Sequence, residues 1–490
     1  MPKKALRLLV VILLLVFGAA LPVQAGAGST PDLSLLEEIH NYIIGNHVDN
    51  PDEGSLIQGA IEGMLDALND PYTTYLPPQS LENFRGSING DYAGIGVSLD
   101  GSGPYPKVDT VFETSPAMRA GLKAGDLIVK VDGVDVAGTP LGRVTEKIRG
   151  PEGTTVVLVI RREGRDDFEV AVKRANINIP TAETKVLEDG TGYIRILSFG
   201  SHTPGEFEDG LKSLRDKKVT SLIIDLRDCP GGLLSTAVDI AGNFVAPGKA
   251  VTSVIDRDGK TETYRAAGDA AGKDMRIAVL VNHNSASASE ILAGALQDYG
   301  LAVLVGGPTY GKGSVQSVIP LKSGGALKLT TARYHTAKNR AIDGKGLKPD
   351  IQVLSPGLEL FAAQRYLHPM PGIALVYERS GNTMLLNGGR VKISQTPLVL
   401  EGRRYLPLRL TLEALGFQVD WRERDGSIKI GGEGMDVIYY PQEGRVTAGA
   451  AEVSGGPLIE MNGVFYLPAD DLKFFGASLR EDENGACIEK

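Results

Sequence analysis

Three serines lie within five positions of the segment NHNSASASEILAG: Ser285, Ser287 and Ser289. The strand-like run RIAVLVN precedes them, and an apolar pattern with helical spacing follows them. A serine between a strand end and a helix N-terminus lies where backbone N–H groups and the helix dipole favour negative charge. Because the tetrahedral intermediate of acyl transfer needs that environment, this position suits a nucleophile.

Ser287 also fits a purely structural role. With Glu290 it forms S-x-x-E before an apolar run, which is the pattern of a capping box at the start of a helix. A nucleophilic serine further needs a base. None of the six histidines stands in a recognisable catalytic motif, and neither G-x-S-x-G nor H-E-x-x-H occurs. The spacing alone leaves open both the cap and a histidine base that is distant in sequence.

Lys312 offers a second kind of base. It stands in GGPTYGKGSVQSV, four residues before Gln316, and in an extended chain both side chains point to one face. A lysine can act as a base only where its surroundings, such as burial, favour the neutral amine. A solvated lysine in a glycine turn is the commoner case. The segment also imitates a phosphate-binding loop, but Gly313 stands where that loop needs Ser or Thr, and a strand pattern follows instead of a helix.

The elements around these residues predict an α/β multidomain chain. Residues 32–70 carry two runs with apolar residues at helical spacing, and residues 91–174 change to short strands with a hairpin bend at Gly164. From residue 191 to about 349, buried strands mix with helices, which is typical of a sheet covered by helices. Residues 380–490 contain two copies of one strand–turn–strand–helix–strand unit and predict a small α+β domain of two repeats.

The first 25 residues predict an export signal. Basic residues precede an apolar run from Leu8 to Ala20, and a small-x-small cleavage pattern ends at Ala25. The alternative is an uncleaved membrane anchor, although the run is short for a spanning helix. The net charge of -9 argues against a nucleic-acid partner. Cys229 and Cys487 are too few and too far apart for a disulfide framework or a metal cluster.

Several separated motifs together resemble one family. NSASASEILAGALQDYG, then GGPTYGKGSVQ, with DLRDCPGG upstream, are closely similar to the carboxyl-terminal processing proteases, serine peptidases of family S41 with a Ser–Lys dyad and a PDZ domain. The resemblance covers residues 32 to about 372. It implies an N-terminal helical dimerisation region at 32–88, a PDZ domain at 91–174 and a protease core at 176–372.

The resemblance also implies catalytic roles. Ser287 would be the nucleophile, Lys312 the general base, and Gln316 the residue that orients the lysine. Backbone N–H groups would form the oxyanion hole, with donors from Ala288 and from a glycine of the pair Gly231 and Gly232. No metal or cofactor is implied.

One departure from the family is visible. The family usually has asparagine where Asp228 and Cys229 stand. A backbone donor in the oxyanion hole does not depend on these side chains, so the departure leaves the predicted activity in place.

The glycine-rich segment YAGIG predicts the peptide-binding loop of the PDZ domain. Its N–H groups would hold a C-terminal carboxylate, while the next strand edge pairs with an extended peptide. The loop residues are Tyr92, Ala93, Gly94, Ile95 and Gly96. In relatives, an arginine late in this domain couples peptide binding to activation, and Arg149 in KIRGPEGT matches that position.

The predicted function follows from these parts. Residues 380–490 resemble the stalk-type domain named after the N-terminal region of copper amine oxidases, but they contain no His or Cys cluster for copper, and cell-wall or membrane attachment is expected instead. We expect an exported serine endopeptidase, a homodimer, that acts on proteins and peptides with free C-termini. The rival hypothesis is a catalytically silent PDZ scaffold that binds C-termini without cutting them.

Overall fold

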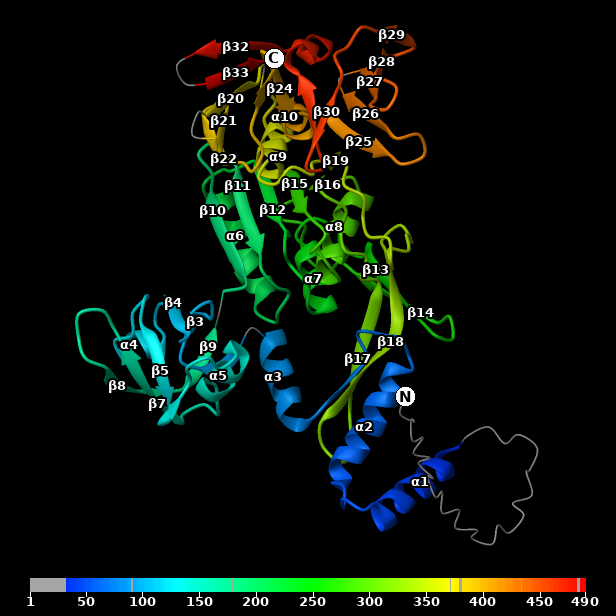
Figure 1. The fold of residues 1–490 in the computed structure, drawn as a ribbon. Helices are drawn as coiled ribbons and strands as arrows, with labels where there is room; N and C mark the ends of the chain where they lie inside the picture. The colour runs from blue at the N-terminus through cyan, green and yellow to red at the C-terminus, as the bar shows by residue number, and fades with distance from the viewer. Residues whose placement is uncertain are drawn as a thin grey trace, which may run out of the picture. The chain divides into compact units, whose positions relative to one another are not determined.

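The computed structural model describes residues 32–490 except 90, 179, 371, 379–380, 433 and 483–484 (Figure 1). The predicted signal segment, residues 1–25, lies outside the described residues. The chain divides into two compact units, residues 1–70 and 71–490. The prediction of a mixed α/β multidomain fold is confirmed. In the described part of the chain, no helix is both long and apolar enough to cross a membrane.

In the N-terminal unit, the described residues 32–70 form two helices, α1 (Leu33–Asn46) and α2 (Glu53–Asp66). Asp32 and Asp52 cap them, because each carboxylate accepts hydrogen bonds from N–H groups of the first turn. Neither helix contains a buried residue. Large apolar side chains stay in solvent, among them Leu33, which is 78% exposed. The apolar faces that define these helices in the sequence therefore have no core of their own.

The second unit begins with a strand, a helix and an antiparallel β-domain. Its main sheet has the order β3-β4-β5-β7-β8, with β6 paired to β5, and a separate pair joins β2 to β9. The predicted bend at Gly164 lies between β7 and β8, where its φ of 81° suits glycine. The elements are β1 (Thr74–Leu76), α3 (Pro78–Asn89), β2 (Asp91–Gly94), β3 (Val97–Asp100), β4 (Lys107–Val111), α4 (Pro116–Arg119), β5 (Leu127–Val131), β6 (Val134–Asp135), α5 (Leu141–Ile148), β7 (Thr155–Arg161), β8 (Phe168–Lys173) and β9 (Ala175–Asn178).

A six-stranded sheet of order β10-β11-β12-β15-β16-β19 forms the centre of the α/β region, and all its strands except β10 run parallel. One face packs on α6, α7 and α8, and α9 packs on the other. Because the carboxyl ends of parallel strands meet at one edge, the loops after β12, β15 and β16 come together. The elements are β10 (Ala182–Val186), β11 (Gly192–Ile196), α6 (Thr203–Asp216), β12 (Ser221–Asp225), α7 (Leu234–Ala241), β15 (Arg276–Val281), α8 (Ala288–Asp298), β16 (Ala302–Gly306), β19 (Ile351–Gln352) and α9 (Glu359–Leu367).

A second sheet, of order β1-β18-β13-β14 with β17 also paired to β18, contains the strand predicted after Lys312. The run SVQSVIPL forms β17, as its alternation predicts. The strands are β13 (Ala250–Asp256), β14 (Thr261–Arg265), β17 (Ser314–Pro320) and β18 (Ala326–Thr336).

The C-terminal region contains three small sheets, and the two predicted repeats pair with each other. Strand β24 of the first copy lies antiparallel to β31 of the second, and each is followed by a short helix, α10 or η1. Trp421, the only tryptophan of the chain, is 47% exposed and stacks on Phe465 with ring centroids 5.8 Å apart. The elements are β20 (Ala374–Glu378), β21 (Thr383–Leu386), β22 (Gly389–Lys392), β23 (Leu398–Leu400), β24 (Arg403–Pro407), α10 (Leu408–Ala414), β25 (Gln418–Arg422), β26 (Ser427–Gly432), β27 (Met435–Tyr440), β28 (Arg445–Ala448), β29 (Ala451–Val453), β30 (Ile459–Met461), β31 (Val464–Pro468), η1 (Ala469–Phe475), β32 (Ser478–Asp482) and β33 (Gly485–Glu489).

Candidate active site

The turn between β15 and α8 distinguishes the three serines. Ser285 and Ser289 are fully buried, and their hydroxyls donate to the carbonyls of Leu226 (2.8 Å) and Cys229 (2.9 Å). Ser287, between them, is only partly buried. The outer two serines therefore fix the turn to the loop after β12, and the middle one is left accessible for chemistry.

Ser287 itself has an unusual backbone conformation. Its φ of 57° and ψ of −116° lie in a region that costs a non-glycine residue about 1 to 3 kcal/mol. The predicted Glu290 half of the capping box is present, since the carboxylate accepts from the Ser287 N–H (2.9 Å). Such strain persists only where surrounding contacts over-determine it, and it gathers at functional sites.

The carboxylate of Glu290 connects the serine turn to the lysine segment. It is fully buried, and it accepts hydrogen bonds from four donors. Oε2 takes the N–H groups of Ser287 and Lys312, both at 2.9 Å, and Oε1 takes the Thr309 hydroxyl (2.6 Å) and the Gly311 N–H (2.7 Å). Hydrogen bonds to a charged acceptor are the strong ones, so this buried charge is stabilised while it holds two segments at one point.

Tyr334 of β18 joins the same two segments through their carbonyl groups. Its buried hydroxyl lies 3.0 Å from the carbonyl oxygen of Ser287 and 2.7 Å from that of Lys312. Burial, together with the nearby Glu290 charge, raises the pKa of Tyr334 well above its usual range, so the phenol remains a donor. Glu290 and Tyr334 thus hold the backbones of Ser287 and Lys312 from both sides.

The side chains of Lys312 and Gln316 contact neighbouring residues. The Lys312 Nζ lies over the ring of Tyr72, 4.6 Å from the ring centroid. The Gln316 amide donates to the hydroxyls of Ser314 (3.0 Å) and Thr330 (3.2 Å). The structure therefore brings Ser287 and Lys312 together through their backbones. The roles of Lys312 and Gln316 in proton transfer from Ser287 stay predictions.

The loop after β12 approaches the serine turn closely. A Cβ on Gly231 would lie 2.5 Å from the Ala286 carbonyl oxygen, 2.8 Å from the Ala288 nitrogen and 2.9 Å from the Ser287 Cβ. Only glycine fits there, also because its φ is 94°. Gly232, with a φ of 153°, would place a Cβ 2.3 Å from the Phe199 carbonyl oxygen. The predicted oxyanion donors thus belong to backbone that lies against Ser287, and their role stays a prediction.

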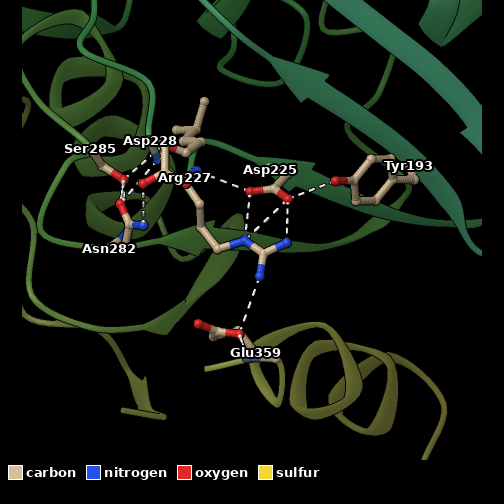
Figure 2. Close-up of polar contacts among 9 residues, drawn as sticks. Tyr193, Asp225, Arg227, Asp228, Asn282, Ser285 and Glu359 are labelled. Carbon is tan, nitrogen blue, oxygen red and sulfur yellow. Dashed lines mark hydrogen bonds and ion pairs between the residues drawn. The ribbon is translucent and has the colours of Figure 1, made fainter. Parts of the chain in front are cut away.

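A polar network fixes this loop at its base, as Figure 2 shows. Asp225 accepts from the Tyr193 hydroxyl (2.7 Å) and pairs with Arg227 (2.6 Å), which also reaches Glu359 of α9 (3.2 Å). Burial and the bond to Asp225 keep the Tyr193 phenol protonated by raising its pKa. The network therefore anchors the loop after β12 to the sheet and to α9.

Asp228 connects the same loop to the serine turn (Figure 2). Its carboxylate accepts from the side-chain amides of Asn284 (2.8 Å) and Asn282 (3.0 Å), which hold the pKa of Asp228 below its usual value. The neighbouring Cys229 is buried, and burial raises the pKa of its thiol, so it stays protonated. The departure from the family sequence at these positions leaves the backbone contacts of the loop intact.

A groove of about 200 Å³ lies in the β-domain between the start of β3 and helix α5. Its lining includes Gly94, Ile95 and Gly96 of the predicted loop, and also Arg149 at the end of α5. Gly96 has a φ of 81°, and a Cβ there would meet the Ser115 Cβ at 2.3 Å. The predicted loop residues Tyr92 and Ala93 lie in β2, which pairs with β9, and their role in peptide binding stays a prediction.

Among the described residues, no group of three His, Cys, Asp or Glu side chains is arranged to hold a metal ion.

Four families match the chain in the order of these parts. Residues 22–79 match the activating protease CtpB N-terminal domain, 107–162 a PDZ domain, 190–353 peptidase family S41, and 385–488 the copper amine oxidase N-terminal domain. The described fold and these matches confirm the resemblance to the carboxyl-terminal processing proteases, a PDZ domain beside an S41 serine-peptidase core.

Individual proteins that are similar to this chain are also named as serine proteases. CtpA-like serine proteases of Staphylococcus haemolyticus (strain JCSC1435) and Staphylococcus aureus (strain COL) are 35% and 36% identical over 327 residues. That alignment covers 66% of this chain and 65% of each relative, so the chain spans slightly less than two thirds of their length. A solved photosystem II D1 C-terminal processing protease is 29% identical, with 69% of this chain and 98% of that chain covered and a TM-score of 0.41.

Proposed function

We propose that this protein is an exported serine endopeptidase that selects substrates by their C-termini and cleaves with Ser287 as nucleophile and Lys312 as base. The observation that carries the proposal is the joint fixation of both segments. The Glu290 carboxylate holds the N–H groups of Ser287 and Lys312, and Tyr334 holds their carbonyls. A serine that served only as a helix cap would not need to be connected to a lysine 25 residues later in the chain.

The proposed reaction is acyl transfer. Neutral Lys312 takes the proton of the Ser287 hydroxyl as its oxygen attacks the substrate carbonyl carbon. The N–H groups of Ala288 and of Gly231 or Gly232 stabilise the oxyanion. The ammonium then protonates the leaving amine, and water, deprotonated by the lysine, releases the acyl group and restores Ser287.

The groove of the β-domain supports recognition of a C-terminus with apolar side chains. Gly94 to Gly96 offer N–H groups for a carboxylate, and β3 offers an edge to which an extended peptide adds as a strand. The walls carry Val97, Leu99, Leu141 and Ile148, which favour apolar side chains on the bound tail. Arg149 on the groove wall is the proposed connection between a bound tail and activation.

Three further parts of the proposal concern location and assembly. Residues 1–25 direct export, by cleavage or by tethering to the membrane. The helices α1 and α2, which bury no residue in one chain, pair with those of a second copy into a homodimer. The C-terminal region attaches the enzyme to the cell wall or membrane. Cross-linking between single cysteines placed on α1 tests the homodimer.

The rival function, a PDZ scaffold that binds without cutting, is favoured by one observation: Lys312 Nζ contacts Tyr72. Peptide cleavage and labelling by a serine-directed acylating probe separate the two. We expect both in the full chain and neither in Ser287→Ala. Peptide binding to the groove without cleavage or labelling in the unaltered chain would establish the scaffold instead. Comparison of protein C-termini in cells with the active and the Ser287→Ala forms would then identify substrates.

A further inference from the structure

The segment directly before β1 brings an aromatic ring to the proposed base. The Lys312 Nζ lies 4.6 Å from the centroid of the Tyr72 ring. At that distance the negative face of the ring attracts a cation, whereas the neutral amine gains no comparable attraction. The contact therefore stabilises the form of Lys312 that cannot accept a proton.

The position of Tyr72 is set by the strand next to Lys312. Thr73 is buried, and its hydroxyl accepts the Thr330 N–H of β18 at 3.0 Å. The following residues form β1, which pairs antiparallel with β18. Thr330 also accepts from the Gln316 amide at 3.2 Å. The Tyr72 segment is thus attached to β18, the strand that also pairs with β17, which begins two residues after Lys312.

Other titratable groups lie around the lysine segment. The Glu290 carboxylate contacts the Lys312 N–H, and the Tyr334 hydroxyl contacts its carbonyl. Asp343 accepts from the Gly313 N–H at 3.0 Å and pairs with Arg333 of β18 at 2.9 Å. These contacts reach the backbone or one another, and replacement of Tyr72 leaves them in place. A change in Lys312 titration that Tyr72→Leu causes and Tyr72→Phe does not therefore reports the ring.

We propose that Tyr72 is a positioning residue whose ring favours Lys312 as an ammonium and so raises the pH at which the lysine can act as a base. The importance of this contact for catalysis rests on the proposed function, in which Lys312 is the base. Tyr72 follows the N-terminal helical unit by two residues.

Trace labelling with acetic anhydride tests the contact without any substrate. The reagent modifies only neutral amines, so the labelling of Lys312 against pH, read by mass spectrometry in full-length Ser287→Ala protein, gives its titration midpoint. We expect Tyr72→Leu to move that midpoint down by about 0.4 to 1.5 pH units, the equivalent of one cation–π contact. Tyr72→Phe keeps an aromatic ring, so its Lys312 midpoint should stay close to that of the protein with Tyr72. Tyr75→Leu, in the adjoining strand β1, is the matched control and should not move the midpoint.

Cleavage by the Ser287-intact variants gives the second readout. The acid limb of kcat/KM should move in Tyr72→Leu by the same interval as the labelling midpoint. An unchanged midpoint in Tyr72→Leu, or an equal shift in Tyr75→Leu, overturns the inference. The Lys312→Ala variant tests separately whether Lys312 is the base. Substantial cleavage by that variant would show that Lys312 is not the base, whatever the labelling of Tyr72→Leu shows.

Discussion

Replacement of Glu290 by glutamine tests whether one buried carboxylate assembles the active site. The carboxylate accepts two hydrogen bonds on each oxygen. Glutamine offers one oxygen and one NH₂ group. The NH₂ group fits best in the place of Oε1, where the Thr309 hydroxyl can rotate and accept a hydrogen bond from it. The Gly311 N–H then faces another donor. Loss of one charge-assisted bond at a buried N–H, and weakening of the rest, should lower the free energy of unfolding by about 2 to 4 kcal/mol.

The effect on turnover should exceed the effect on folding. A displacement of about 1 Å between nucleophile and base costs on the order of a hundredfold in rate, so we expect kcat of Glu290→Gln to fall about a hundredfold or more with KM little changed. Calorimetry measures stability, and peptide cleavage measures turnover, on protein shown to be folded. Glu206→Gln is the matched control, because Glu206 accepts from the Thr181 N–H, the Thr181 hydroxyl and the Ala182 N–H away from this site. Turnover of Glu290→Gln within threefold of the unaltered enzyme would refute the reasoning.

The remaining predictions concern the dyad, the pH profile, the oxyanion loop and recognition. Ser287→Ala and Lys312→Ala should each abolish peptide cleavage on a folded chain, and the double variant should be no worse than either, because the two act as one unit; retained cleavage in Lys312→Ala would point to a histidine base. Cleavage should rise with pH as Lys312 becomes neutral, and a rate that is flat from acid to alkaline pH contradicts a lysine base. Gly231→Ala should remove activity, since its Cβ would lie 2.5 Å from a carbonyl oxygen, and near-normal cleavage would show that the loop moves freely. Amidation of a substrate C-terminus should weaken binding roughly ten- to a hundredfold, and Arg149→Ala should lower turnover with little change in peptide affinity; equal cleavage of free-acid and amidated peptides would exclude C-terminus-directed recognition.

Local patterns predicted the elements that carry the site. The strand–turn–helix around Ser287, the strand after Lys312 and the hairpin at Gly164 follow from apolar periodicity and turn residues. The Glu290 half of the capping box was also correct. Each of these depends on residues close together in the chain, where side-chain spacing is fixed by the helix or strand itself.

The contacts that assemble the site could not be predicted from local sequence patterns. Glu290 as a bridge to Lys312, and Tyr334 as a donor to both segments, depend on how strands from two sheets are placed. The segment with Tyr72 and Thr73 directly follows the second helical run of residues 32–70, and β1 after it pairs with β18 some 250 residues later. The DPYTTYL segment has turn and strand residues, but nothing in it indicates which strand it will pair with.

The single tryptophan has a practical consequence for experiments on this protein. Trp421 lies in β25 of the C-terminal region, partly exposed and stacked on Phe465. Intrinsic tryptophan fluorescence will therefore report the unfolding of that region alone. It will not report the unfolding of the residues 190–353 that match family S41. An emission-based unfolding curve could show a fully stable protein after a substitution that has already loosened the serine turn. A tryptophan introduced at Tyr310, which is 57% exposed beside Lys312, would give the core an optical signal of its own.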